Sequence, residues 1–182
     1  MRIVLGLEYC GVGFCGWQSQ VQGCGVQDAL ETAIAAVADE KIRVTTAGRT
    51  DTGVHAAFQV VHFDTEVKRP LTAWVRGVNS HLPPGVAVLW AREAGEDFHA
   101  RFAAMQRGYR YVLLNHPVRP ALNHGLLGWY HHPLDAAAMN AAAALLIGQH
   151  DFTAFRAAEC QAKSPVKDLQ LLHIERRGDY LM

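Results

Sequence analysis

One loop carries most of the side chains in this chain that could do chemistry. Residues Ala47–Ala56 read AGRTDTGVHA, so that Arg49, Asp51 and His55 alternate with small residues and two glycines. Arg49 offers a planar fork of N–H donors, Asp51 is a carboxylate close to it, and the glycines allow backbone conformations that other residues resist. An ordinary loop, in which Asp51 and Thr50 bond neighbouring backbone amides, explains the same residue types.

Segment 101–111 combines arginines with aromatic rings and contains no acidic residue. The side chains concerned are Arg101, Phe102, Arg107, Tyr109, Arg110 and Tyr111. Such a face suits RNA, because guanidinium groups pair with phosphates and rings stack on bases. A strand whose outward arginines are simply solvated fits the pattern equally well.

A glycine motif near the start of the chain imitates a dinucleotide site. Gly11–Gly16 reads GVGFCG and follows a strand pattern, which matches G-x-G-x-x-G. A dinucleotide site needs a helix that begins at those glycines, whereas here Trp17 and Gln18 lead to further glycines. We therefore expect no nicotinamide or flavin cofactor.

The cysteines give no indication of a metal site. The chain has four, Cys10, Cys15, Cys24 and Cys160, and contains neither a Cys-x-x-Cys nor a His-x-x-x-His pair. A chain of this length with an ordinary core does not need disulfide bonds, so we expect reduced thiols.

The elements that must position the loop follow from hydrophobic periodicity. Alternation predicts strands and 3.6-residue spacing predicts helices. In chain order we expect a strand at 3–9, a helix at 26–37, strands at 42–46 and 59–63, a helix at 71–82 and a strand at 86–90. This order is that of a ferredoxin-like βαββαβ domain, with two helices on one face of an antiparallel sheet. The loop then projects from between two strands.

A second run of elements follows the first. We expect a strand at 109–114, an alanine-rich helix at 135–147, a strand at 169–174, a tight turn at 176–179 and a strand that begins at 180. The sequence thus predicts an α+β protein with a ferredoxin-like domain at 1–96 and a related, incomplete α+β domain at 97–182.

Composition excludes several classes of protein. The chain has 182 residues, of which half are hydrophobic and 19% are charged, so it is not disordered. It has neither a signal peptide nor an apolar run long enough to span a membrane, and we expect a cytoplasmic protein. The formal net charge of zero gives no general attraction to a polyanion.

Ala47–Ala56 and further segments resemble one known family along essentially the whole chain. The matching segments are Glu8–Tyr9, Gly16–Gln18, Ala47–Ala56, Gln59–Phe63, Gly77–Asn79, Leu82–Pro83, Asp97–Phe102, Tyr109–Tyr111 and Asp151–Thr153. In this order they are similar to tRNA pseudouridine synthases of the TruA type.

The resemblance implies a function for each candidate residue. Asp51 becomes the nucleophile that isomerises uridine to pseudouridine, without a cofactor. Arg49 fills the space that a flipped base leaves, Tyr109 packs beside that base, and His55 is a structural hydrogen-bonding residue. The candidate phosphate contacts are Arg101, Arg107 and Arg110. The implied partners are the anticodon stem-loop of many tRNAs and a second copy of the chain in a homodimer.

Members of this family continue beyond the position of Met182. Their additional segment completes the second sheet and carries an arginine that pairs with the catalytic aspartate, so we expect a chain truncated at its C-terminus. Two alternatives stay open. One is an RNA-binding module without catalysis, although Gln59–Phe63 lacks the stacking rings of such modules. The other is a catalytically inactive fragment.

Overall fold

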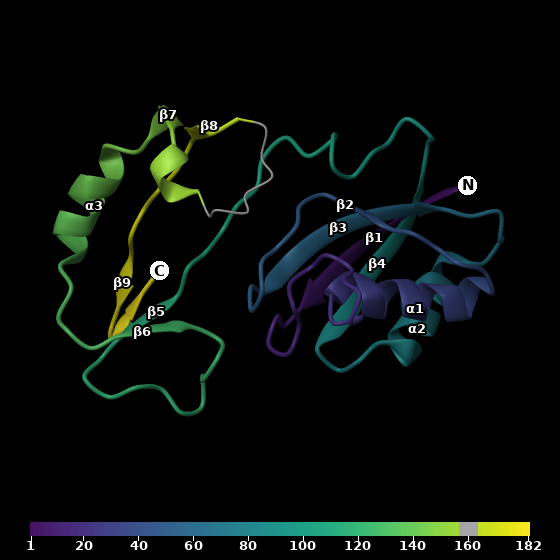
Figure 1. Ribbon diagram of the computed structural model, residues 1–182, viewed down its shortest axis with the longest axis horizontal. Helices are drawn as coiled ribbons and strands as arrows, with labels where there is room; N and C mark the ends of the chain where they lie inside the picture. The colour runs from purple at the N-terminus through teal and green to yellow at the C-terminus, as the bar shows by residue number, and fades with distance from the viewer. Residues whose placement is uncertain (157–163) are drawn as a thin grey trace. The chain divides into compact units, whose positions relative to one another are not determined.

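The structure, a computed structural model, describes residues 1–156 and 164–182. These form two compact units, Met1–Gly108 and Tyr109–Met182 (Figure 1). Cys160 lies outside the described residues. No helix in the described part of the chain is long and apolar enough to cross a membrane.

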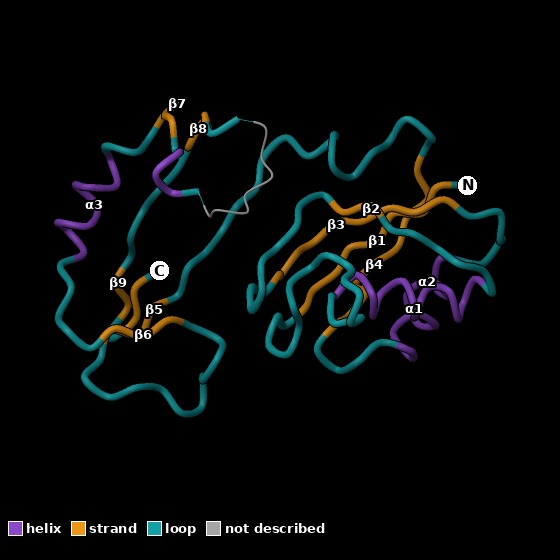
Figure 2. The backbone as a smooth tube through the Cα atoms, viewed as in Figure 1, coloured by secondary structure: helices purple, strands orange, loops and turns teal. Residues whose placement is uncertain are grey.

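The first unit is an antiparallel sheet with two helices on one of its faces (Figures 1 and 2). Its elements are β1 (Arg2–Tyr9), α1 (Val26–Ala38), β2 (Thr45–Thr46), β3 (Ala56–Asp64), α2 (Leu71–His81) and β4 (Val86–Ala94). The strands lie in the order β2-β3-β1-β4, and every neighbouring pair is antiparallel. The predicted ferredoxin-like βαββαβ order is confirmed.

The core of the first unit lies between the sheet and the two helices. Its larger fully buried side chains are Ile3, Leu5, Leu7, Leu30, Ile34, Val61, Phe63, Trp74 and Val78. The rings of Phe63 on β3 and Trp74 on α2 meet edge to face, with 5.3 Å between their centroids. Alternate residues of β1 and β3 point into this core, which is the reason that their period-two pattern could be recognised in the sequence.

Segment 96–102 packs against β1 and β3 of the first unit. Arg2 binds the Asp64 carboxylate through Nε (2.8 Å) and Nη2 (2.7 Å), and its Nη1 donates to the carbonyl oxygens of Glu96 and Phe98. The backbone N–H of Ala100 donates to Nδ1 of His62 (3.1 Å). The compact unit continues to Gly108, whereas the predicted domains divide at residue 96.

Burial favours the neutral form of the His62 ring, which can accept the hydrogen bond from Ala100. It lowers the pKa of His62 below its ordinary value, and the nearby charges of Arg2 and His99 lower it further. A neutral ring leaves one nitrogen as an acceptor, which suits the N–H that points at Nδ1. The ring of His99 meets that of His62 edge to face, at 4.8 Å between centroids.

The second unit contains two small sheets and one helix (Figure 1). Its elements are β5 (Leu113–Asn115), β6 (Gly128–Tyr130), α3 (Ala136–Ala144), β7 (Gly148–Asp151), a 3₁₀ turn (Thr153–Phe155), β8 (Val166–Leu169), β9 (Arg176–Arg177) and β10 (Tyr180–Leu181). One sheet has the order β6-β5-β10-β9, and β7 pairs with β8. The Asp135 side chain caps α3 by accepting from the N–H groups of Ala137 and Ala138.

The sequence located the elements of the second unit less well than those of the first. The turn at 176–179 and the strand that begins at Tyr180 are confirmed by the β9–β10 pair. The strand predicted at 169–174 is wrong, because regular strand structure ends at Leu169. Ile174 instead bonds the side chain of Asn140, donating to Oδ1 (2.9 Å) and accepting from Nδ2 (2.7 Å), so its backbone groups are not available to a strand partner.

Candidate active site

The loop that carries Asp51 connects β2 to β3, and its first residues are fixed to β3. The Ala47 N–H donates to the Val60 carbonyl oxygen (2.8 Å). The Gly48 carbonyl oxygen accepts from Nε2 of Gln59 (2.7 Å), whose side chain is buried, and from Oγ1 of Thr46 (3.1 Å). The loop therefore leaves the sheet in a defined direction.

Thr50, which precedes Asp51, is held by the core. Its carbonyl oxygen accepts from the N–H of Trp17 (2.9 Å), and its hydroxyl lies 2.8 Å from that of Tyr9. Trp17 and Tyr9 are both buried. The carbonyl oxygen of Asp51 accepts from the N–H of Val54 (3.1 Å), which closes a turn around the aspartate. Asp51 itself is exposed, so a carboxylate reaches solvent from a fixed backbone.

The glycine motif at Gly11–Gly16 packs against this loop. Helix α1 begins at Val26, well after the glycines, as the sequence predicted. The Gly11 N–H donates to Nδ1 of His55 (3.0 Å), which gives His55 the hydrogen-bonding role expected of it. Gly16 has φ +90°, and a Cβ there would lie 2.9 Å from the Thr50 carbonyl oxygen. A side chain at position 16 would collide with the loop, so the glycine serves close backbone packing.

The expectation of reduced thiols is wrong for two of the cysteines. Cys15 and Cys24 form a disulfide, with their Cα atoms 5.4 Å apart. The loop between them folds back so that the N–H of Cys15 donates to the carbonyl oxygen of Cys24 (2.9 Å), and this turn brings the two side chains together. Chain length and core size do not reveal such local proximity. Cys10 has a free thiol.

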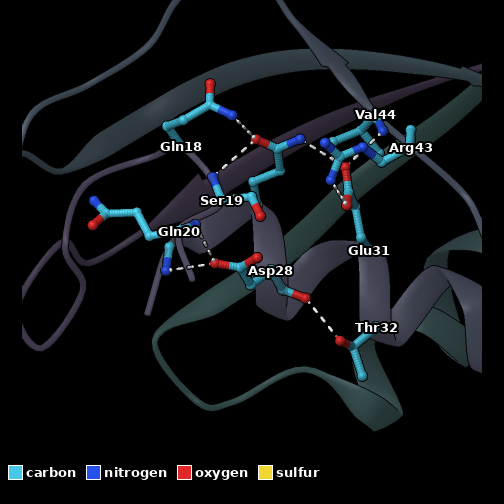
Figure 3. Close-up of polar contacts among 10 residues, drawn as sticks. Gln18, Ser19, Gln20, Asp28, Glu31, Thr32, Arg43 and Val44 are labelled. Carbon is cyan, nitrogen blue, oxygen red and sulfur yellow. Dashed lines mark hydrogen bonds and ion pairs between the residues drawn. The ribbon is translucent and has the colours of Figure 1, made fainter. Parts of the chain in front are cut away.

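A polar network joins the loop between β1 and α1 to α1 itself and to the residues that lead into β2 (Figure 3). Oε1 of the buried Gln27 accepts from Nε2 of Gln18 (3.0 Å), and Nε2 of Gln27 donates to Oε1 of Glu31 (2.7 Å). Glu31 also accepts from the N–H of Val44 (3.0 Å) and from Arg43 (3.2 Å). The network thus links three segments of the chain through side chains of α1.

The Asp28 carboxylate caps the N-terminus of α1. Its carboxylate accepts from the N–H groups of Gly25 (2.9 Å) and Gln20 (3.3 Å), as Figure 3 shows for Gln20. Burial raises the pKa of Asp28, but hydrogen bonds from Ser19, Gly25 and Gln20 outweigh it and hold that pKa below the usual value. The charged carboxylate at the helix N-terminus is thus favoured by both hydrogen bonding and the helix dipole.

The structure brings only some of the predicted site residues together. Arg49 and Asp51 are both exposed on the loop, and Arg107 reaches its first residue, since Nε (3.2 Å) and Nη2 donate to the Ala47 carbonyl oxygen. Arg101 belongs to the same unit, and its guanidinium carbon lies 5.9 Å from the centre of the Phe102 ring.

Two predicted residues belong to the second unit. Tyr109 and Arg110 are its first residues, and both are exposed. Among the described residues, no three His, Cys, Asp or Glu side chains are grouped so that they could hold a metal ion.

Sequence reasoning missed two features of the site. One is the contact of Arg107 with Ala47, which joins residues far apart in sequence. The other is the packing of the glycine motif on the loop. A signal for the second was available, because glycines that do not open a helix still allow another segment of backbone to approach closely.

Comparison with known proteins yields one family. The model of a family described as tRNA pseudouridine synthase matches residues 5–103 and 142–181. The first range includes every helix and strand from α1 to β4, most of β1, and Arg49, Asp51 and Arg101. Arg107, Tyr109 and Arg110 lie between the two matched ranges.

Curated relatives match over nearly the whole chain. A protein named tRNA pseudouridine synthase A from Thiobacillus denitrificans is 75% identical over 182 residues, which are all of this chain and 70% of the relative. Proteins of the same name from Chromobacterium violaceum (65% identical; 96% of this chain and 67% of the relative) and Dechloromonas aromatica (61%; 98% and 68%) are also similar.

Proposed function

The chain belongs to the tRNA pseudouridine synthase family, and we propose that it converts uridine to pseudouridine in tRNA with Asp51 as nucleophile. The observation that carries the proposal is the position of this aspartate. Its carboxylate is exposed, while Thr50 and Val54 fix the backbone on either side of it. A nucleophile that must form and then release a covalent bond needs access to substrate and a preorganised backbone.

The proposed reaction is an isomerisation and needs no redox partner. The bond from ribose C1′ to N1 of uracil breaks, the base turns, and C1′ bonds to C5. C5 then loses its proton, and N1 gains one. A carboxylate that attacks either the sugar or the base is regenerated at the end, so Asp51 can turn over without a cofactor.

The remaining roles concern the RNA. A base within a stem or loop is reached only when it leaves the stack, and Arg49, two residues before Asp51, has the reach and the donors to occupy the vacated space. Tyr109, an exposed ring, packs beside the flipped base in this proposal and assists loss of the C5 proton. Arg101 and Arg110 then supply positive charge for phosphates, and Arg107 is a third candidate for such a contact.

The proposed substrate is the anticodon stem-loop of several tRNAs, modified at neighbouring uridines on its 3′ side. An enzyme that accepts many sequences must read backbone shape and flexibility, because base-edge contacts would restrict it to one sequence. We further propose that the chain works as a homodimer in the cytoplasm, where tRNA is abundant.

Release of tritium from tRNA labelled at uridine C5 tests the proposal. We expect release by the wild-type chain and a loss of about a thousandfold or more in the Asp51→Asn variant, which keeps the shape of the side chain and replaces the nucleophilic carboxylate with a neutral amide. Asp39→Asn is a matched control, because it changes another exposed aspartate of the same unit at the end of α1. It should leave the rate unchanged.

Two other results would redirect the assignment. Binding of tRNA by the full chain without any release of tritium would favour an RNA-binding module or an inactive fragment over the synthase. Equal release by the wild-type chain and by Asp51→Asn would exclude Asp51 as the nucleophile while leaving the reaction in place.

A further inference from the structure

A long segment of the first unit ends on the catalytic loop. Arg2 anchors the beginning of segment 96–107 through the carbonyl oxygens of Glu96 and Phe98. Ala100 is buried and bonds His62 of β3. The segment is thus attached to the sheet at two points before it reaches the loop.

Arg107 binds the first residue of the loop with two of its donors. Nε lies 3.2 Å from the carbonyl oxygen of Ala47, and Nη2 donates to the same atom. The guanidinium also lies against Gly48, where an added Cβ would be 3.0 Å from Nε and 3.4 Å from Cδ. Gly48 therefore leaves the space that the arginine occupies, and the two residues form a fitted contact immediately before Arg49 and Asp51.

We propose that Arg107 is a positioning residue, which holds the start of the catalytic loop and so aligns Asp51; the proposal rests on the proposed function of that loop. Gln59 and Val60 hold the same two residues from β3. Arg107 contacts Ala47 and Gly48 from segment 96–107, so that the start of the loop is held from two sides. Lysine would not reproduce this contact, because its ammonium can donate to a carbonyl oxygen but lacks the planar fork that places two donors on it.

A phosphate contact is the competing interpretation of Arg107, and the two interpretations predict different behaviour. A phosphate contact depends mainly on charge, so lysine would replace arginine well and its removal would weaken RNA binding. A positioning residue depends on geometry, so lysine would not replace it and its removal would lower kcat. The slope of log Kd against log salt would fall by about 0.7 to 0.9 only if a phosphate contact is lost.

Hydrogen–deuterium exchange of residues 45–52 is the first measurement, because it does not depend on activity. We expect faster exchange in Arg107→Gln and in Arg107→Lys than in the wild-type chain. Arg101→Gln is the matched control, since it removes the same charge from the same segment, and the Arg101 guanidinium lies over the Phe102 ring whereas that of Arg107 binds Ala47. Its exchange in residues 45–52 should equal that of the wild type.

Kinetics supply the second measurement. We expect both Arg107 variants to lose about tenfold or more in kcat, with KM and the salt slope of tRNA binding nearly unchanged. Unchanged exchange in Arg107→Gln would overturn the proposal, and so would full activity of Arg107→Lys. A wild-type chain that releases no tritium would contradict the proposed function instead, and the exchange comparison would still decide whether Arg107 holds the loop.

Discussion

Gly16 packs closely against the backbone of the loop that carries Asp51. Its φ is +90°, and a Cβ added there would lie 2.9 Å from the Thr50 carbonyl oxygen, so a side chain at this position meets two separate obstacles. Gly13 in the same loop meets only the first, since its φ is +86° and nothing lies within 4 Å of an added Cβ. The two glycines therefore allow the cost of backbone strain to be separated from the cost of a collision with the catalytic loop.

We predict that Gly16→Ala lowers tritium release by about tenfold to a hundredfold, because the methyl group displaces the backbone beside Asp51. Gly13→Ala should have nearly wild-type activity, although each substitution costs about 1–3 kcal/mol of stability from the strained φ. Steady-state rates and denaturant unfolding of the two variants provide the check. Equal activity losses in the two variants would mean that backbone strain in the glycine-rich loop, and not the contact with Thr50, lowers the rate.

At the scale of elements, β3 joins the core to the site. It begins directly after the catalytic loop, and its side chains alternate between two faces. Phe63 is fully buried against Trp74 of α2, whereas Phe58 is 66% exposed on the other face, where its ring lies 6.0 Å from that of Trp90. Strand β3 thus carries two phenylalanines, one buried in the core and one exposed on the opposite face.

We predict that Phe63→Ala lowers the free energy of unfolding by about 3–5 kcal/mol, because it leaves a cavity in the core. Phe58→Ala should cost about 1 kcal/mol or less, since it removes one ring contact at an exposed position. Urea unfolding followed by circular dichroism measures both. A large loss for Phe58→Ala would show that its face of the sheet is covered in solution.

The elements that the sequence predicted well are those whose pattern repeats over several residues. The alternation of Ile3, Leu5 and Leu7 predicted β1, and the spacing of Leu30 and Ile34 predicted α1. The loop with Asp51 was predicted from residue types and from resemblance. Contacts between distant segments could not be predicted in this way, because local pattern carries no information about which residues meet after folding. The fork of Arg107 on Ala47 is one example, and the bonding of Ile174 by Asn140 is another.

At the scale of the whole molecule, the two units differ in how much apolar surface they bury. The first has a continuous core between sheet and helices. In the second, the buried apolar side chains among the described residues are Leu114, Ala143 and Leu181. Large side chains such as Leu122, Leu145 and Leu171 are exposed there. Since burial of apolar area is the main favourable term in folding, the first unit has far more to stabilise it.

We predict that a fragment of residues 1–108 unfolds in one cooperative transition, whereas a fragment of residues 109–182 does not, because few apolar side chains in the second unit leave water. Thermal melts by circular dichroism compare the two, and binding of a fluorescent apolar dye should be strong only for the second. A cooperative melt of fragment 109–182 with no dye binding would contradict this, and would mean that its exposed leucines are not a stability deficit. Cooperative melting of 1–108 would also give a folded host in which the catalytic loop can be studied alone.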